Sequence, residues 1–197
     1  MLSRFLAGLL CTAGLLTATC ADAQPRAPAR NYDHTVAGSD PVARFFSFST
    51  SPVARTTVSY PGNHRPGTIV INTKERRLYL VTGSGQAIRY GIGVGRVGFG
   101  WSGVTRVAAK REWPDWTPPE QMLKRRPDLP RFMPGGPDNP LGARALYLGA
   151  SLYRIHGSNE PETIGQAVSS GCFRLTNEDV IDLYNRVPVG AAVIVQQ

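Results

Sequence analysis

Residues 67–94, GTIVINTKERRLYLVTGSGQAIRYGIGV, hold three short apolar runs separated by turn residues. The runs at 68–72, 77–81 and 87–94 are rich in Val, Ile and Tyr, which favour strands. The charged triplet at 74–76 and the Gly-Ser-Gly at 83–85 are typical of turns between antiparallel strands. This stretch therefore predicts a meander of antiparallel strands.

The chain after this meander continues in strand-sized pieces with one helix. Gly149-Ala150 separates two short apolar runs and so predicts a hairpin. Thr176 is a helix-capping residue, Asp179 stands at the position that completes a capping box, and Pro188 stops the helix. We therefore expect a mainly β domain with a short helix near its end. The expected elements are strands over 104–113, 145–148, 152–156 and 191–195 and a helix from Thr176 to Val187.

The segment 114–144 interrupts this pattern with eight prolines and a pair of glycines. Inside it, Thr117 followed by two prolines and Glu120 predicts a short helix capped by Thr117, which ends near Arg126. A long ordered loop in a compact domain usually has a function, so we expect a lid or a substrate wall, although a decorative insertion fits equally.

The N-terminal residues have the composition of an export signal. A basic start is followed by an apolar run at 5–18 and by Ala21-Asp22-Ala23, which predicts a signal peptide over 1–23. The apolar run is too short to span a bilayer comfortably, so no integral membrane span is expected. Residues 24–66 are rich in Pro, Ala, Ser and Thr and predict a flexible arm before a domain at 67–197. The predicted location is the periplasm or the cell envelope.

The overall charge narrows the choice of partners. The chain of 197 residues carries a formal net charge of +8, which suits an anionic partner. For an exported protein that partner is a wall polymer or a membrane surface, and no nucleic acid is expected. A generally basic exported protein without such a partner fits the charge as well.

The cysteine count points to chemistry. Cys11 and Cys20 leave with the signal peptide, so Cys172 remains alone and cannot form an internal disulfide. Three scattered histidines and one cysteine do not form a zinc site, so neither a metal nor another cofactor is expected. Cys172 is therefore an inert buried thiol, an interchain disulfide partner or a nucleophile.

The neighbours of Cys172 favour a nucleophile. A thiol needs a base within hydrogen-bond reach, and His156, sixteen residues earlier at a strand end, is the best candidate. The cationic Arg174 favours the thiolate. We therefore expect a catalytic Cys172 to be alkylated quickly near neutral pH.

Two glycines complete the predicted site. A Ser-Gly-Cys turn can present the backbone N–H groups of Gly171 and Cys172 to a developing oxyanion. The imidazole of His156 also needs an orienting partner, and the backbone carbonyl of Gly157 is the candidate. Trp101, Trp113 and Trp116 can line a glycan groove, although packing in the core or the lid fits at least as well.

The wider pattern resembles the L,D-transpeptidase catalytic domain family. The resemblance covers about 67–197, and it rests on motifs that are specific in combination. Those motifs are Pro66–Ile71, Tyr90–Gly95, Asn139–Gly142, Ile155–Pro161, Ile164-Gly165, Ser169–Leu175, Asp179-Val180, Leu183-Tyr184 and Val187–Gly190.

The resemblance implies a β-sandwich with the cysteine at the mouth of a cleft. It implies that Cys172 is the nucleophile and His156 the base, and that Arg174, Ser170 and Ser169 contact the substrate. The substrate would be a peptidoglycan tetrapeptide stem, cleaved with release of D-alanine. Many members of the family have a His where Ser170 stands here, so the tuning of the thiol differs from theirs.

Several acceptors remain open for the acyl group. A second stem gives a 3-3 cross-link, an envelope protein gives anchoring, a D-amino acid gives exchange, and water gives an L,D-carboxypeptidase. A papain-like peptidase is disfavoured because His156 precedes Cys172 in the chain. A non-catalytic wall-binding module is the alternative outside enzymes.

Overall fold

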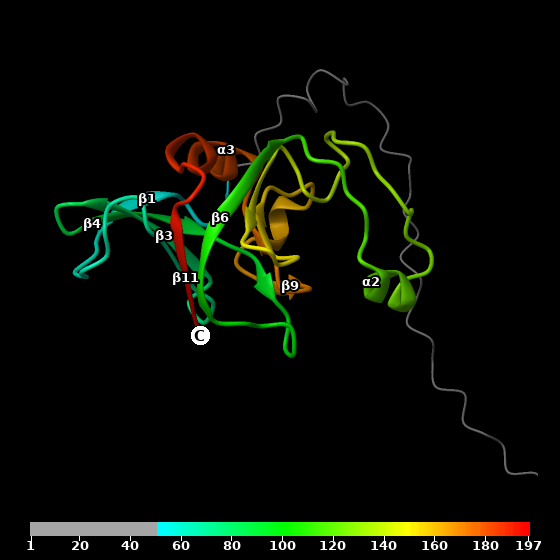
Figure 1. The fold of residues 1–197 in the computed structure, drawn as a ribbon, viewed down its shortest axis with the longest axis horizontal. Helices are drawn as coiled ribbons and strands as arrows, with labels where there is room; N and C mark the ends of the chain where they lie inside the picture. Colours follow the sequence, from blue (N-terminus) through cyan, green and yellow to red (C-terminus); the bar gives the residue numbers. More distant parts are fainter. Residues whose placement is uncertain (1–50) are drawn as a thin grey trace, which may run out of the picture. The chain divides into compact units, whose positions relative to one another are not determined.

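The computed structural model describes residues 51–197, so the predicted signal peptide 1–23 and the arm residues 24–50 lie outside the described part. Most elements of this part are strands, as expected, and none of its helices is long and apolar enough to cross a membrane. Figure 1 shows their arrangement. The elements are β1 (Thr56–Ser59), β2 (Ile69–Asn72), β3 (Arg77–Gly83), β4 (Gln86–Gly91), β5 (Val94–Gly95), β6 (Gly103–Glu112), α2 (Glu120–Arg125), β7 (Arg144–Leu148), β8 (Arg154–His156), the 3-10 helix η1 (Pro161–Thr163), β9 (Ala167–Ser169), β10 (Phe173–Arg174), α3 (Asn177–Arg186) and β11 (Ala192–Gln196).

Nine strands form one sheet in the order β1-β4-β3-β2-β11-β6-β7-β8-β10. The pairs β2–β3 and β3–β4 are antiparallel, which confirms the predicted meander. Strand β11 joins the two parts of the sheet, because it runs parallel to β2 and antiparallel to β6. The small second sheet pairs β5 with β9 in parallel.

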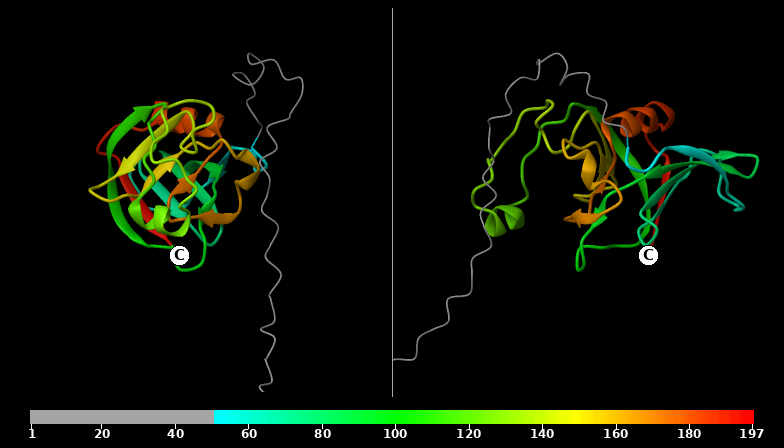
Figure 2. Two further views of the ribbon diagram at one scale, coloured as in Figure 1. Left: turned by 90° about the vertical axis from the view of Figure 1, so that its right-hand side faces the viewer. Right: turned by 180° about the vertical axis from the view of Figure 1, so that it is seen from behind.

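The long strand β6 lets the sheet fold over on itself. Its first residues, up to Arg106, pair with β11, and its later residues, from Val107, pair with β7. The register shifts between Val107 and Ala109, and such irregularities bend a strand and increase its twist. Figures 1 and 2 show β6 running diagonally between the two parts of the sheet.

One hydrophobic core fills the space between the two parts of the folded sheet. Both parts contribute fully buried side chains to it, and α3 adds one side of the core with Val180, Leu183 and Val187. Each such side chain contributes about 1.5–3 kcal/mol of hydrophobic stabilisation. The fold is therefore the expected mainly β sandwich. The largest fully buried side chains of this core include Ile69, Leu78, Tyr90, Leu146, Ile155 and Phe173.

The prediction of a helix capped by Thr117 was wrong. Helix α2 begins at Glu120, its N-cap is Pro119, and no side chain caps it. Pro119 clashes with a helical conformation of the residue before it, so the helix cannot begin earlier. The predicted end before Pro127 is confirmed, because α2 ends at Arg125.

The expected third strand over 87–94 is divided. Strand β4 ends at Gly91, and the backbone of Gly93 then donates to and accepts from Arg174 at 2.9 Å instead of pairing with β3. The chain thus leaves the meander to reach β10 and β9. No local pattern predicts the short strands β1, β9 and β10, because they depend on partners far away in the chain.

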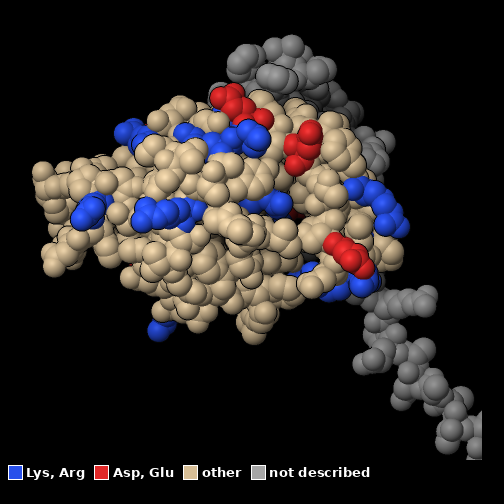
Figure 3. All heavy atoms as spheres, viewed as in Figure 1, with Lys and Arg blue, Asp and Glu red and all other residues tan. Residues whose placement is uncertain are grey.

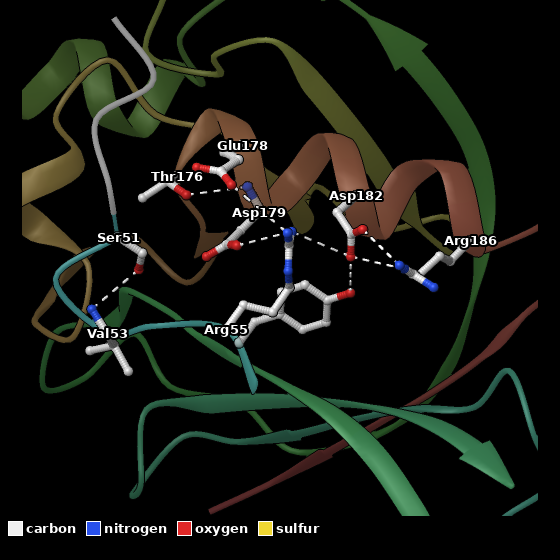
Figure 4. Close-up of polar contacts among 9 residues, drawn as sticks. Ser51, Val53, Arg55, Thr176, Glu178, Asp179, Asp182 and Arg186 are labelled. Atoms are coloured by element: carbon white, nitrogen blue, oxygen red, sulfur yellow. Dashed lines mark hydrogen bonds and ion pairs between the residues drawn. The ribbon is translucent and has the colours of Figure 1, made fainter. Parts of the chain in front are cut away.

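Helix α3, which follows the Cys172 loop, is held at its N-terminal end. Thr176 caps it as predicted, accepting from the Asp179 N–H at 3.2 Å. Arg55, just before the edge strand β1, lies 3.3 Å from Asp179 Oδ1 and 3.4 Å from Asp182 Oδ2 (Figure 4). Burial raises the pKa of the Asp179 carboxyl, and the Arg55 charge opposes that rise. The arginine therefore compensates a carboxylate that is 3% exposed.

Replacing Arg55 with Ala should lower the free energy of unfolding by about 1–3 kcal/mol, because Asp179 then loses its charged partner. Urea denaturation at pH 7 measures this. The double variant Arg55→Ala/Asp179→Asn should recover part of the loss, and Arg65→Ala is the exposed control. Equal stability of Arg55→Ala and wild type would contradict the role of Arg55.

Candidate active site

The pairing of β10 with β8 brings the predicted catalytic residues together. These strands run in parallel, with Phe173 opposite Ile155 and Arg174 opposite His156. Residues opposite each other in a ladder project to the same face, and alternate residues share that face. Cys172, one residue before β10, therefore lies on the face that carries Arg174 and His156, diagonal to His156 at a spacing of about 7–8 Å between backbones.

The thiol itself lies against the start of β8. Cys172 Sγ is 3.9 Å from the carbonyl oxygen of Leu152, and the backbone N–H of Arg154 is a hydrogen-bond donor to the thiolate form. This agrees with the register, which places Cys172 beside Arg154. Cys172 is a free thiol and half-buried.

His156 is fixed in one orientation. It is 4% exposed, and its Nδ1 lies 2.6 Å from the carbonyl oxygen of Gly157. Because a carbonyl only accepts hydrogen bonds, Nδ1 must carry the proton, which leaves the lone pair on Nε2. The Gly157 carbonyl, which was the candidate orienting partner from the sequence, therefore contacts the imidazole of His156.

Gly157 itself is held in tight packing. A Cβ at Gly157 or at Gly142 would clash with Asn177 Oδ1, which accepts from the Ala143 N–H at 2.8 Å. Asn177 is the first residue of α3. The carbonyl that orients His156 is thus positioned by the same helix that follows the Cys172 loop.

Burial sets the protonation of the pair. Desolvation lowers the pKa of His156 to about 3, assisted by the charges of Arg174 and Arg154 and opposed by the Gly157 hydrogen bond. Desolvation also raises the pKa of the Cys172 thiol from its ordinary value, although the Arg154 N–H and the charges of Arg154 and Arg174 oppose the rise. The resting pair is therefore a neutral thiol and a neutral imidazole. Arg174 favours the thiolate, as expected, but burial outweighs it, so fast alkylation near neutral pH is no longer expected.

Ser169 and Gly171 shape the loop that carries Cys172. The Ser169 hydroxyl, 2% exposed with its residue, donates to the Cys172 carbonyl at 2.7 Å and accepts from the Gly171 N–H at 3.1 Å. Gly171 has a φ of 107°, which favours glycine. A substrate contact by Ser169, or an oxyanion contact by the Gly171 N–H, would require these bonds to open. Ser170, between Ser169 and Gly171 in the chain, is half-buried.

Trp101 packs against the core, which is one of the positions expected from the sequence, and it also contacts this loop, which the sequence did not predict. Its Nε1 donates to the Gly171 carbonyl at 3.2 Å, and its ring stacks on Tyr153 at 4.8 Å between centroids. A Cβ at Gly171 would come within 2.5 Å of the Tyr153 ring. Trp101 and Tyr153 therefore hold the loop from the core side. The sequence could not show this, because Trp101 lies far from Cys172 in the chain.

The predicted substrate residue Arg174 has a partner within the chain. Its Nη1 lies 3.0 Å from Glu160 Oε2, while its Nε is buried without a partner in the described part. Arg154, on the same face, also has a buried Nε without a partner there, and its guanidinium lies 5.2 Å from the centre of the Tyr147 ring. Two guanidinium groups thus lie on the same face of β8 and β10 as the thiol.

The excursion 114–144 reaches the neighbourhood of the site. Figures 1 and 2 show it leaving β6, carrying α2 away from the sandwich and returning to β7. On α2, the Arg125 guanidinium lies 5.2 Å from the centre of the Phe99 ring. The Phe99 backbone in turn packs where a Cβ of Gly95 or Gly171 would be. The excursion is therefore in contact with the loop that supports Cys172.

The comparisons with known proteins agree on a family. A family model described as the L,D-transpeptidase catalytic domain matches residues 66–195. The Escherichia coli K12 protein "Probable L,D-transpeptidase ErfK/SrfK" is 43% identical over 142 residues, which are 68% of this chain and 44% of that protein. The chain thus spans less than half the length of this relative.

Solved structures show a similar fold. A Brucella melitensis protein named as a carnitine operon oxidoreductase is 46% identical with a TM-score of 0.51, over 75% of this chain and 96% of that one. An L,D-transpeptidase from Mycobacterium smegmatis is 17% identical with a TM-score of 0.54, over 66% and 58%. The oxidoreductase name belongs to the Brucella protein alone, whereas the family model indicates the transpeptidase domain.

The alkylation rate of Cys172 tests the neutral pair. Because burial raises its thiol pKa, alkylation by iodoacetamide should be slow at pH 7 and rise about tenfold per pH unit from pH 7 to pH 9. Stopped-time mass spectrometry of the folded protein measures the rate. A plateau between pH 6 and pH 8 would show a preformed thiolate instead.

Trp101→Phe tests the support of the loop. The phenyl ring keeps a stacking partner for Tyr153 but cannot donate to the Gly171 carbonyl, so the loop should relax and expose the thiol. We expect alkylation at pH 8 to accelerate about three- to tenfold. Trp113→Phe, outside this loop, should change the rate less than twofold. Equal rates for both variants would remove the positioning role of Trp101.

Proposed function

We propose that this chain, which belongs to the L,D-transpeptidase catalytic domain family, is a cysteine acyltransferase of the bacterial cell wall. Cys172 attacks the tetrapeptide stem of peptidoglycan at the carbonyl of the third residue and releases the terminal D-alanine. The observation that supports this most directly is the β8–β10 register, which sets Cys172 and His156 on one face. The Gly157 carbonyl accepts from Nδ1 of His156, which leaves the lone pair on Nε2 free to take a proton.

The neutral resting pair determines how acylation starts. As Sγ attacks the carbonyl carbon, His156 Nε2 takes the thiol proton, and a C–S bond forms while the carbonyl oxygen becomes an oxyanion. The Cys172 N–H, for which no acceptor is found among residues 51–197, is the donor best placed for that oxyanion. The oxyanion then collapses, the C–N bond to D-alanine breaks, and the imidazolium returns the proton to the leaving amine.

The second half of the reaction transfers the acyl group. The nitrogen of an acceptor amine attacks the thioester, a C–N bond forms, the C–S bond breaks, and His156 carries the amine proton to the thiolate sulfur. The acceptor is a second stem in a 3-3 cross-link or an envelope protein. A D-amino acid or water at the same site would give exchange or an L,D-carboxypeptidase.

The charges around the thiol suit this donor. Arg154 and Arg174 flank Cys172 on one face, and guanidinium groups bind carboxylates with paired hydrogen bonds. The terminal carboxylate of the stem lies one residue from the bond that breaks, so an arginine beside the thiol can orient it. Ser170, next to the same loop, remains a proposed substrate contact.

The proposed location is the periplasm or cell envelope, because the sequence predicts a signal peptide over 1–23 and the wall polymer is anionic. The excursion 114–144 is proposed as a lid, since α2 contacts Phe99 beside the Cys172 loop. The alternative outside enzymes is a wall-binding module in which Cys172 has no role.

Intact-mass spectrometry with a purified disaccharide-tetrapeptide tests the function. Wild type should release D-alanine and show an acyl adduct that is absent in Cys172→Ala, and His156→Gln should lower the rate at least about a hundredfold. A carbapenem should give an adduct on the same cysteine.

The same samples separate the two classes of function. The wall-binding module would be supported if well-folded wild type forms no adduct and no product. In that case wild type and Cys172→Ala should bind isolated wall with equal affinity.

A further inference from the structure

A groove lies beside the Cys172 loop, on the side opposite the thiol. It has a volume of about 610 Å³. We call it the basic groove. Gly171 and Phe173 form one end, Phe99 and Trp101 form an apolar wall, and Lys74, Arg76 and Arg96 are its charged residues. This volume is within the range of about 300–1,000 Å³ that is typical of ligand sites.

The charge of the groove has one sign. No Asp or Glu of the described part lines it, and Lys74, Arg76 and Arg96 form no ion pair among residues 51–197. Arg76 donates to the Gly165 carbonyl at 2.8 Å, and Arg96 lies 4.7 Å from the centre of the Phe99 ring, which leaves donors of both arginines available. Figure 3 shows Lys and Arg spread over the face seen in Figure 1, with fewer acidic side chains. A hollow lined by cations concentrates anions.

The groove is separated from the proposed donor site by the loop itself. Phe173 alternates with Cys172 and Arg174 along the strand, so its side chain lies on the opposite face, in the core. The groove borders on Phe173 and Gly171, whereas Arg154 and Arg174 lie on the thiol face. A ligand in the groove therefore does not compete with a stem whose carboxylate contacts these arginines.

We propose that the basic groove binds a second anionic peptide, the stem that accepts the acyl group, an inference that rests on the proposed function. Transfer between two stems requires both peptides at Cys172 at once. A stem carries free carboxylates for Lys74, Arg76 and Arg96 and small apolar side chains for the wall of Phe99 and Trp101. Neither water nor a single D-amino acid needs a groove of this volume. The groove thus selects peptide transfer over hydrolysis.

The groove also contacts the loop that positions the nucleophile. Trp101 forms its wall and donates to the Gly171 carbonyl, one residue before Cys172. The acceptor would bind against the same side chain that holds the loop. Its amine would approach the thioester around the Gly171–Cys172 turn, and there a C–N bond forms as the C–S bond breaks.

The test uses two probes and a triple variant of the full mature chain, Lys74→Gln/Arg76→Gln/Arg96→Gln. The first probe is a disaccharide-tripeptide, which lacks D-alanine and so cannot act as a donor. Its binding to Cys172→Ala, measured calorimetrically at low salt, should weaken about tenfold when the triple substitution is added. The second readout is the ratio of 3-3 dimer to released D-alanine with the disaccharide-tetrapeptide, which should fall about tenfold in the triple variant.

The matched control is Arg65→Gln/Arg106→Gln/Arg111→Gln. It removes the same charge from exposed arginines outside the groove, and Arg106, like Arg76, donates to a backbone carbonyl. Both triple variants must keep the wild-type thermal midpoint, and the control should change each readout less than twofold. Unchanged tripeptide binding in the groove variant, or equal weakening in both, overturns the groove. Tripeptide binding is measured without turnover, whereas the absence of any acyl adduct in wild type overturns the proposed function.

Discussion

The parallel pairing of β10 with β8 is the contact on which the site depends. Each strand is only two or three residues long, yet their register alone decides that Cys172 and His156 share a face. Such short strands have little stability by themselves and exist because the sandwich core holds both ends. The buried side chains of Ile155 and Phe173 on the opposite face therefore fix the chemistry on this face.

The loop before β10 is held by contacts of its own. The Ser169 hydroxyl bonds to the backbone within the loop, and Trp101 holds the Gly171 carbonyl from the core side. Helix α3 follows directly, and its first residue, Asn177, packs against the glycine whose carbonyl orients His156. The proposed nucleophile and base are thus supported by one connected set of contacts, which is what a reaction with strict geometry requires.

Charge is distributed differently inside and around the site. Within it, burial favours the neutral forms of both the thiol and the imidazole, so in the proposed reaction proton transfer would accompany the attack instead of preceding it. Around it, cations lie on both sides of the Cys172 loop, with Arg154 and Arg174 on the thiol face and the basic groove on the other. Anionic groups are attracted to both sides, which suits the proposed joining of two anionic peptides.

The sequence by itself determined the mainly β class, the antiparallel meander, the Thr176 cap and the pair of candidate residues Cys172 and His156. These follow from local signals: apolar periodicity, turn residues, capping chemistry and a specific motif. Only the tertiary structure decided the division of the strand at Gly93, the support from Trp101 and the neutral state of the pair. These depend on register, on contacts between distant segments and on burial, and residue order carries no direct record of how deeply a side chain will be buried.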